Sequence, residues 1–194
     1  SFYKMKDYYV AGYQFERFAS SYPKSEKAEE ASFLGAKSSY MLSPVYSKDQ
    51  KETSQAIEKL QECINVFPES EYLPEANKLI KELVYKLEKK AFEIAKQYDK
   101  ISDYEASIKS FDNFVFDFPG STLREDALFY KLDASFKLAI NSVKYKQETR
   151  LKNAKSVAET FNKSYADSKY KDQVNDMLEK IEEQLKNYST KANI

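Results

Sequence analysis

Apolar residues recur along this chain at every third or fourth position, and short polar breaks interrupt them at regular intervals. Between residues 7 and 21, for example, the apolar positions include Tyr8, Ala11, Phe15 and Phe18. This i, i+3, i+4, i+7 spacing places them on one face of an amphipathic helix. The same pattern predicts helices over 7–21, 25–40, 52–66, 70–99, 102–118, 121–140, 151–161 and 168–185, with a helix end at 2–6. The chain is therefore predicted to be all-α.

Alternate breaks share one short motif, which we call the kernel: an aromatic residue, proline, any residue and serine. It occurs at 22–25, 67–70 and 118–121, and a fourth copy at 165–168 has alanine in place of proline. Proline cannot continue the preceding helix, because it lacks an N–H group. The serine is predicted to cap the next helix, whose first turn carries acidic residues in the first three copies. The kernel thus joins two helices and performs no chemistry.

The kernels recur at intervals of roughly 45 to 50 residues, which indicates a helical repeat array. Between residues 90 and 119, positions such as Ala95, Tyr98 and Phe111 match the small and large positions of a tetratricopeptide repeat. We therefore predict a single domain over 1–194, in which tetratricopeptide-like helix-turn-helix repeats stack in a right-handed superhelix. It would hold about four hairpins plus a C-terminal helix, with the N-terminal repeat truncated.

Three segments depart from a regular array. The segment 41–50 contains Pro44 and is longer than a tight turn needs, which makes it a candidate contact site. The segment 70–99 is unusually long, and its pattern fits one helix or two kinked halves. Ser102 and Glu105 have the spacing of a capping box, and 141–148 is predicted to be a polar break.

The composition excludes several kinds of site. The 194 residues include three glycines and no histidine, which argues against glycine-rich phosphate loops and removes the commonest general base and metal ligand. Basic and acidic residues number 31 each, so the formal net charge is zero and no global field attracts nucleic acid. No apolar run is long enough to span a membrane. We expect no catalytic residue, no cofactor and no metal.

Two sets of residues that could take part in catalysis are better explained by structural roles. Cys63 is the one cysteine and lies within an apolar helical pattern, so we predict a small buried side chain. Adjacent acidic residues such as Glu29 and Glu30 fall at helix starts. Because neighbouring residues on a helix do not face each other, we do not expect paired catalysis from them.

Aromatic residues make up 15% of the chain, and most lie on predicted core faces. Tyrosine combines an apolar ring with a hydrogen-bonding tip, which suits contacts with peptides and proteins. The candidate protein-binding residues, predicted to line the concave side of the array, are Tyr9, Tyr13, Tyr40, Tyr46 and Tyr98, with Tyr3 as a further member.

The first kernel and its flanks resemble one family. Residues 15–31 read Phe-Glu-Arg-Phe-Ala-Ser-Ser-Tyr-Pro-Lys-Ser-Glu-Lys-Ala-Glu-Glu-Ala. They are similar to the Phe-x-x-Phe-x-x-x-Tyr-Pro-x-Ser-x-x-Ala-Glu-Glu-Ala signature of the BamD family, the tetratricopeptide lipoproteins of the outer-membrane β-barrel assembly (BAM) machinery. The Ser43–Pro44 segment, the long helix and residues 103–119 are also similar. The resemblance, of the Bacteroidetes type, covers essentially the whole chain.

The resemblance implies a non-enzymatic scaffold of the BAM complex that helps to insert β-barrel proteins into the outer membrane. The implied partners are the periplasmic domains of BamA, at the C-terminal hairpins, and unfolded outer-membrane β-barrel proteins, at the N-terminal repeats. The implied location is the periplasmic face of the cell outer membrane, through a lipid anchor on an upstream segment. The alternative is another periplasmic tetratricopeptide adaptor, for example that of the Tol–Pal system, and an enzyme is least favoured.

Overall fold

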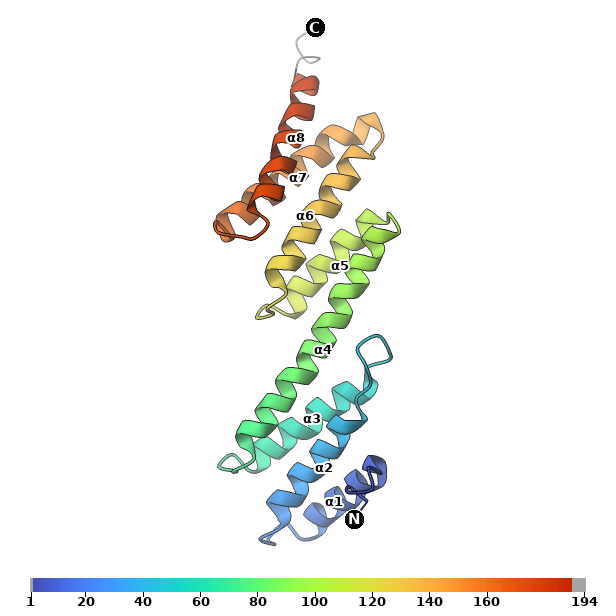
Figure 1. Cartoon of the computed structure of the whole chain (residues 1–194), viewed down its shortest axis with the longest axis vertical. Coiled ribbons are helices and arrows are strands. Elements are labelled where there is room, and N and C mark those ends of the chain that lie inside the picture. The colour runs from blue at the N-terminus through green and yellow to red at the C-terminus, as the bar shows by residue number, and fades with distance from the viewer. Residues whose placement is uncertain (1, 190–194) are drawn as a thin grey trace. The chain divides into compact units, whose positions relative to one another are not determined.

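The computed structural model describes residues 2–189, and over that range every regular element is a helix (Figure 1). The helices are α1 Tyr8–Ser21, α2 Ala28–Leu42, α3 Lys51–Val66, α4 Leu73–Lys100, α5 Tyr104–Asp117, α6 Arg124–Ile140, α7 Lys144–Ser164 and α8 Lys171–Ser189. The all-α prediction is confirmed for the described residues, and each predicted helix corresponds to one of these elements. The right-handed stacking of the repeats stays a prediction.

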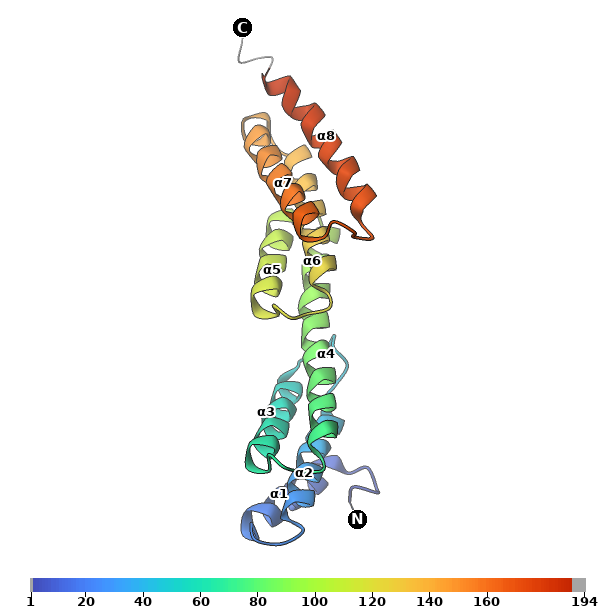
Figure 2. The same cartoon turned by 90° about the vertical axis from the view of Figure 1, so that its left-hand side faces the viewer.

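The chain divides into two compact units, residues 1–90 and 91–194, and the division falls within α4. The sequence pattern left open whether this segment is continuous. In the structure α4 is one helix of 28 residues. Unit 1 contains α1, α2, α3 and the first part of α4, and unit 2 contains the rest of α4 and α5 to α8 (Figures 1 and 2). The single domain over 1–194 stays a prediction.

Each unit is built on its own apolar core. In unit 1, Phe33, Leu60 and Leu83 bring α2, α3 and α4 together. In unit 2, one cluster includes Phe111 and another includes Phe129. Burying a side chain of this size stabilises a fold by about 1.5–3 kcal/mol, so these residues fix which faces of the helices turn inward.

The two units repeat one arrangement of helices. A shift of 96 positions aligns α1 and α2 with α5 and α6, and it pairs Asp7 with Asp103. Each aspartate accepts the N–H three residues ahead, at 3.3 and 3.1 Å, and so caps its helix. The preceding residues, Lys6 and Ser102, have φ angles of 61° and 63°. The capping-box prediction is therefore wrong: Ser102 takes the left-handed conformation that ends α4, and Asp103 caps α5.

All four kernels share one geometry. The aromatic N–H donates to the carbonyl four residues back at 2.9–3.0 Å, which closes the helix. The serine Oγ accepts the N–H two residues ahead, at 3.0–3.2 Å. The next helix begins three residues after the serine, so the predicted N-cap needs correction: the serine closes a turn that leads into the helix. The copy at 165–168 makes the same bonds without proline, so hydrogen bonds define the joint.

The connections between successive hairpins differ between the units. In unit 1, residues 43–50 join α2 to α3, whereas residues 141–143 join α6 to α7 in unit 2. The buried amide of Gln50 donates to the carbonyls of Val45 and Lys48 at 2.9 and 3.0 Å. The longer connection is thus hydrogen-bonded from within, as a loop of fixed shape requires.

Helix α7 starts earlier than its apolar pattern predicts. Most of the predicted polar break at 141–148 is helical, because α7 begins at Lys144. Gln147 in its first turns accepts a hydrogen bond from the hydroxyl of Tyr188 in α8 at 2.6 Å. A turn that packs through a polar side chain gives no apolar signal, which explains the error.

Candidate protein-binding groove

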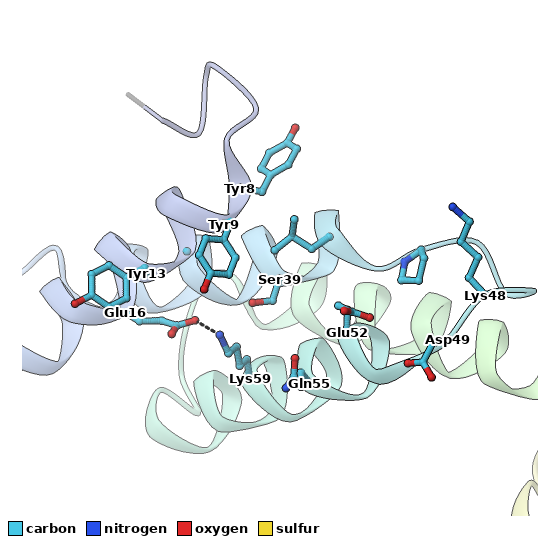
Figure 3. A pocket seen from close by; sticks show the side chains of 13 residues that line it. Tyr8, Tyr9, Tyr13, Glu16, Ser39, Lys48, Asp49, Glu52, Gln55 and Lys59 are labelled. Atoms are coloured by element: carbon cyan, nitrogen blue, oxygen red, sulfur yellow. Dashed lines mark hydrogen bonds and ion pairs between the residues drawn. The ribbon is translucent and has the colours of Figure 1, made fainter.

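A groove runs between α1 and α3 in unit 1. Both helices pack on α2, and the space between them includes a cavity of about 780 Å³ (Figure 3). From α1 the cavity is lined by three tyrosines and a glycine, Tyr8, Tyr9, Gly12 and Tyr13. From α3 it is lined by three polar residues, Glu52, Gln55 and Lys59. The 43–50 connection closes one end with Pro44, Lys48 and Asp49. The groove is therefore a mixed aromatic and charged surface.

Tyr9 and Tyr13 form the aromatic wall. They are one helical turn apart, so they lie on the same face of α1, and Figure 3 shows both rings beside the α3 side chains. Their exposed fractions are 78% and 59%, which are high for large aromatic residues. Two neighbouring exposed tyrosines offer apolar area and two hydroxyl groups to a ligand.

Two glycines bring α1 close to α2. A Cβ atom on Gly12 would lie 3.3 Å from the Cβ of Ser38, which is buried in α2. A Cβ atom on Gly35 would lie 3.1 Å from the Cγ of Glu16 in α1. Both distances are tighter than ordinary contacts, so the spacing of α1 and α2 depends on these small residues.

One ion pair crosses the groove. The Nζ of Lys59 lies 2.5 Å from Oε1 of Glu16 (Figure 3). Both side chains are partly exposed, and pairs of this kind contribute about 0.2–1 kcal/mol. A second cavity of about 610 Å³ lies beyond the pair, lined also by Pro23, Cys63 and Phe67. The pair therefore separates two cavities of one groove, and a charged ligand could replace it at small cost.

Cys63 belongs to the wall of this second cavity. Its side chain is buried, as predicted. Burial raises the pKa of the thiol, so the protonated form dominates at neutral pH. Because the thiolate is the reactive form, Cys63 acts as an apolar wall residue.

The end wall is anchored from α4. The Nζ of Lys86 donates to Oγ of Ser43 at 2.7 Å, and the Nζ of Lys90 donates to the carbonyl of Lys48 at 2.7 Å. Burial lowers the pKa of Lys86. These bonds hold the 43–50 connection against unit 1, so the candidate contact segment and the tyrosine pair border the same groove.

The other predicted tyrosines lie elsewhere. The hydroxyl of Tyr40 donates to Glu82 of α4 at 2.6 Å, and this bond raises the pKa of Tyr40 to about 12. The ring of Tyr46 lies 4.8 Å from the Nζ of Lys89, and Tyr98 belongs to unit 2. Tyr3 packs on Tyr8 and Phe15, with ring centroids 5.4 and 6.2 Å apart. The structure thus groups Tyr9 with Tyr13 only, and the binding role of all these residues stays a prediction.

Sequence reasoning missed the polar half of the groove. Glu16, Lys59 and Gln55 have the spacing of solvated helix faces, and charge alone gave no reason to select them. Gly12 was overlooked because a glycine within a helix carries no periodic signal. The signal that could have found Gly12 is its place beside Tyr9 and Tyr13 on α1.

Unit 2 contains the equivalent groove, between α5 and α7. Its cavity is about 370 Å³. The positions of Tyr9 and Tyr13 hold Glu105 and Lys109 there. Glu105 pairs with Arg150 of α7, and Lys131 of α6 pairs with Asp112 of α5 at 2.6 Å. Charged side chains therefore fill the space that is open in unit 1.

Within residues 2–189, no group of three or more acidic, cysteine or histidine side chains has the arrangement of a metal site. Glu16 and Lys59 neutralise each other. In the same range, no helix has the length and apolar character that crossing a bilayer requires.

Comparison with protein families identifies a matching family model. A family model described as "Outer membrane lipoprotein" matches residues 1–151. The matched region includes all of unit 1, helices α5 and α6, and the start of α7. A comparison with curated proteins found no match.

Proposed function

The chain belongs to the YfiO (BamD) family of outer membrane lipoproteins, and from this premise we propose that it is a non-enzymatic scaffold of the BAM complex. It would bind unfolded outer-membrane β-barrel proteins through unit 1 and the periplasmic domains of BamA through the C-terminal hairpins of unit 2. It would act as one tetratricopeptide domain at the periplasmic face of the outer membrane, held by an N-terminal lipid anchor. The family match favours this role over a Tol–Pal adaptor.

The groove between α1 and α3 is the observation that supports substrate binding. Its two cavities, of about 780 and 610 Å³, follow one another along the helices. An unfolded barrel segment is extended, with aromatic and apolar side chains alternating with polar ones. Tyr9 and Tyr13 offer aromatic contacts, and Glu16 and Lys59 offer one charge of each sign.

Weak contacts suit a protein that passes its ligand on. The ion pair that crosses the groove is partly exposed. An extended segment could therefore bind and leave without opening the core of unit 1. Residues buried under the groove, such as Leu60, need not move.

The first test measures binding of a peptide from the last strand of an outer-membrane barrel protein. The double substitution Tyr9→Ala/Tyr13→Ala should weaken binding about tenfold or more, since aromatic anchors at an interface often contribute over 1 kcal/mol each. The matched control is Glu105→Ala/Lys109→Ala, at the equivalent positions of unit 2. If both double substitutions weakened peptide binding equally, or if neither weakened it, the groove would not be the binding site.

The second test addresses the assembly role itself. The chain, produced with its lipidated upstream segment, should co-purify with the periplasmic domains of BamA. Substitutions on unit 2 that remove contacts between BamA and helices α7 and α8 should reduce this association. The double substitution Tyr9→Ala/Tyr13→Ala should leave it unchanged. Failure to co-purify with BamA under conditions where the fold is intact would overturn the scaffold role.

A further inference from the structure

Unit 2 has two turns that lie together at one end of its helices: residues 101–103, before α5, and residues 141–143, before α7. Arg150 of α7 joins them. Its Nη1 donates to Oγ of Ser142 at 2.7 Å, and its guanidinium pairs with Glu105 in the first turn of α5. We call this end of unit 2 the turn edge.

Three apolar or aromatic side chains stand exposed on the turn edge. Ile101 is 61% exposed, Val143 is 56% exposed and Tyr145 is 80% exposed. They do not line the cavity between α5 and α7. Ile101 and Val143 lie in the two turns, and Tyr145 lies in the first turn of α7. Single exposed apolar residues are ordinary, but three at one end of a unit indicate a surface that is covered in use.

The charges around these side chains are basic. Lys100, Lys144 and Lys146 are exposed, and among residues 2–189 none of the three has a carboxylate within ion-pair distance. Lys146 lies 5.7 Å from the ring centroid of Tyr145. The turn edge therefore presents unpaired lysines beside its apolar side chains.

The neighbouring carboxylates already have partners. Lys137 pairs with both Asp99 and Asp133, at 2.8 and 2.6 Å, and Glu148 lies 2.7 Å from Lys152. Asp103 accepts the backbone N–H of Ala106. Asp103 and one of the two carboxylates on Lys137 offset part of the charge of the three lysines, so the turn edge keeps a small positive charge, although the chain as a whole is neutral.

The equivalent turns of unit 1 show the same composition. Met5 and Val45 are exposed large apolar residues. Lys4 and Lys6 flank Met5, and Lys48 follows Val45 by three residues; all three lysines are exposed. The combination of an exposed apolar side chain and lysine therefore occurs at four turns, two in each unit, which a single chance exposure does not explain.

We propose that the turn edge of unit 2 binds the surface of an anionic phospholipid bilayer. The three exposed side chains would enter the headgroup layer, and the three lysines would contact lipid phosphates. Aliphatic side chains, a tyrosine and lysines are the residues that interfacial segments use, because they match an apolar layer bounded by negative charge. A family of outer membrane lipoproteins works beside such a surface. This binding is separate from the recognition of barrel proteins.

Tryptophan fluorescence gives a direct test, because the chain has no tryptophan. Tyr145→Trp places a probe on the turn edge. Its emission should shift to the blue on addition of vesicles of phosphatidylcholine with phosphatidylglycerol, and stay unchanged with phosphatidylcholine alone. The matched control is Phe116→Trp, an aromatic position 84% exposed in the last turn of α5, roughly 20 Å along the helix from the turn edge.

Charge reversal tests the lysines. The variant Lys100→Glu/Lys144→Glu/Lys146→Glu should bind the anionic vesicles at least about 100-fold more weakly, since the loss of each lysine near such a surface alone removes about a fivefold factor. High salt should also weaken binding of the unaltered chain to the anionic vesicles, because salt screens the charges of the lysines. No vesicle binding by the folded chain, or an equal emission shift at both tryptophan positions, would overturn the proposal. Binding only to an acidic protein would also overturn it.

Discussion

The groove between α1 and α3 and the groove between α5 and α7 occupy the same place in two copies of one arrangement. Their floors match: Ser39 and Leu42 in unit 1 correspond to Ser135 and Leu138 in unit 2, and all four line their grooves. Their walls differ in chemistry. Unit 1 has an open aromatic groove, and unit 2 has a smaller one crossed by ion pairs.

One position shows how the difference arises. Gly35 in α2 leaves Glu16 free to reach Lys59 across the groove. In unit 2 the equivalent of Gly35 is Lys131, which pairs with Asp112 on the near side. A long side chain thus stands in unit 2 at the position where, in unit 1, the glycine lets the Glu16 side chain pack closely. The backbone arrangement decides that a groove exists, and its wall residues decide whether the groove is open to a ligand.

The largest expected difference between the units concerns one pair of phenylalanines. Phe111 is fully buried against Phe92, whereas its counterpart Phe15 is only partly buried. Phe111→Ala should lower the stability of unit 2 by about 3–5 kcal/mol, as deletion of a buried phenyl ring does, and Phe15→Ala should cost unit 1 less than about 2 kcal/mol. Amide hydrogen exchange measured in each unit can separate the losses. Equal losses would show that the walls of unit 1 are as well packed as those of unit 2.

Exchanging the wall residues should change binding more than stability. Tyr9→Glu/Tyr13→Lys gives unit 1 the residues of unit 2, and it should weaken barrel-peptide binding about tenfold or more. The reverse exchange, Glu105→Tyr/Lys109→Tyr, should create no comparable binding because Lys131 still occupies its groove. Titration calorimetry with the same peptide checks both. If the variant Glu105→Tyr/Lys109→Tyr bound the peptide through unit 2, the two tyrosines alone would be sufficient for binding.

The kernels allow a comparison of smaller effects. Ser70→Ala in unit 1 removes the Oγ acceptor for the N–H of Tyr72 and should cost about 1 kcal/mol, the net contribution of one hydrogen bond. In unit 2, Ala166→Pro should stabilise the chain by about 0.4–1 kcal/mol, because its kernel already has the geometry of the proline-containing copies. Chemical denaturation of the variants measures both changes. A destabilising Ala166→Pro would show that the fourth kernel differs from the others.

The smallest expected effect is a dependence on alkaline pH that both units share. The hydrogen bond to Glu82 raises the pKa of Tyr40 to about 12, and burial with a hydrogen bond to Asp126 raises that of Tyr170 to about 12. An unfolded tyrosine has a pKa near 10. Each group therefore stabilises the fold fully below about pH 10 and loses that contribution as pH rises from about 10 to about 12.

Ultraviolet titration of the phenolate can detect these two groups. The folded chain should show a late ionising fraction near pH 12, and Tyr40→Phe and Tyr170→Phe should each remove part of it. A late fraction that survives the double substitution of Tyr40 and Tyr170 would assign it to other tyrosines.

Local patterns predicted the helices and the places where they join. Each kernel closes through backbone hydrogen bonds between residues at most four positions apart, so its meaning is readable without the fold. The same locality explains the errors. Ser102 and Asp103 both suit a cap, and only the left-handed backbone of Ser102 decides between them. The start of α7 was missed because Gln147 packs through a hydrogen bond to Tyr188, a residue far along the chain.

By itself, the sequence determined an all-α chain, its repeated joints and its resemblance to a family. Those features depend on helix propensity, on capping and on apolar periodicity, which act over a few residues. Only the tertiary structure decided that Tyr9 and Tyr13 share a groove with Glu16 and Lys59, while Tyr40 lies bonded to Glu82. That grouping depends on how closely α1 and α3 approach α2, and contacts such as the one at Gly12 set those distances.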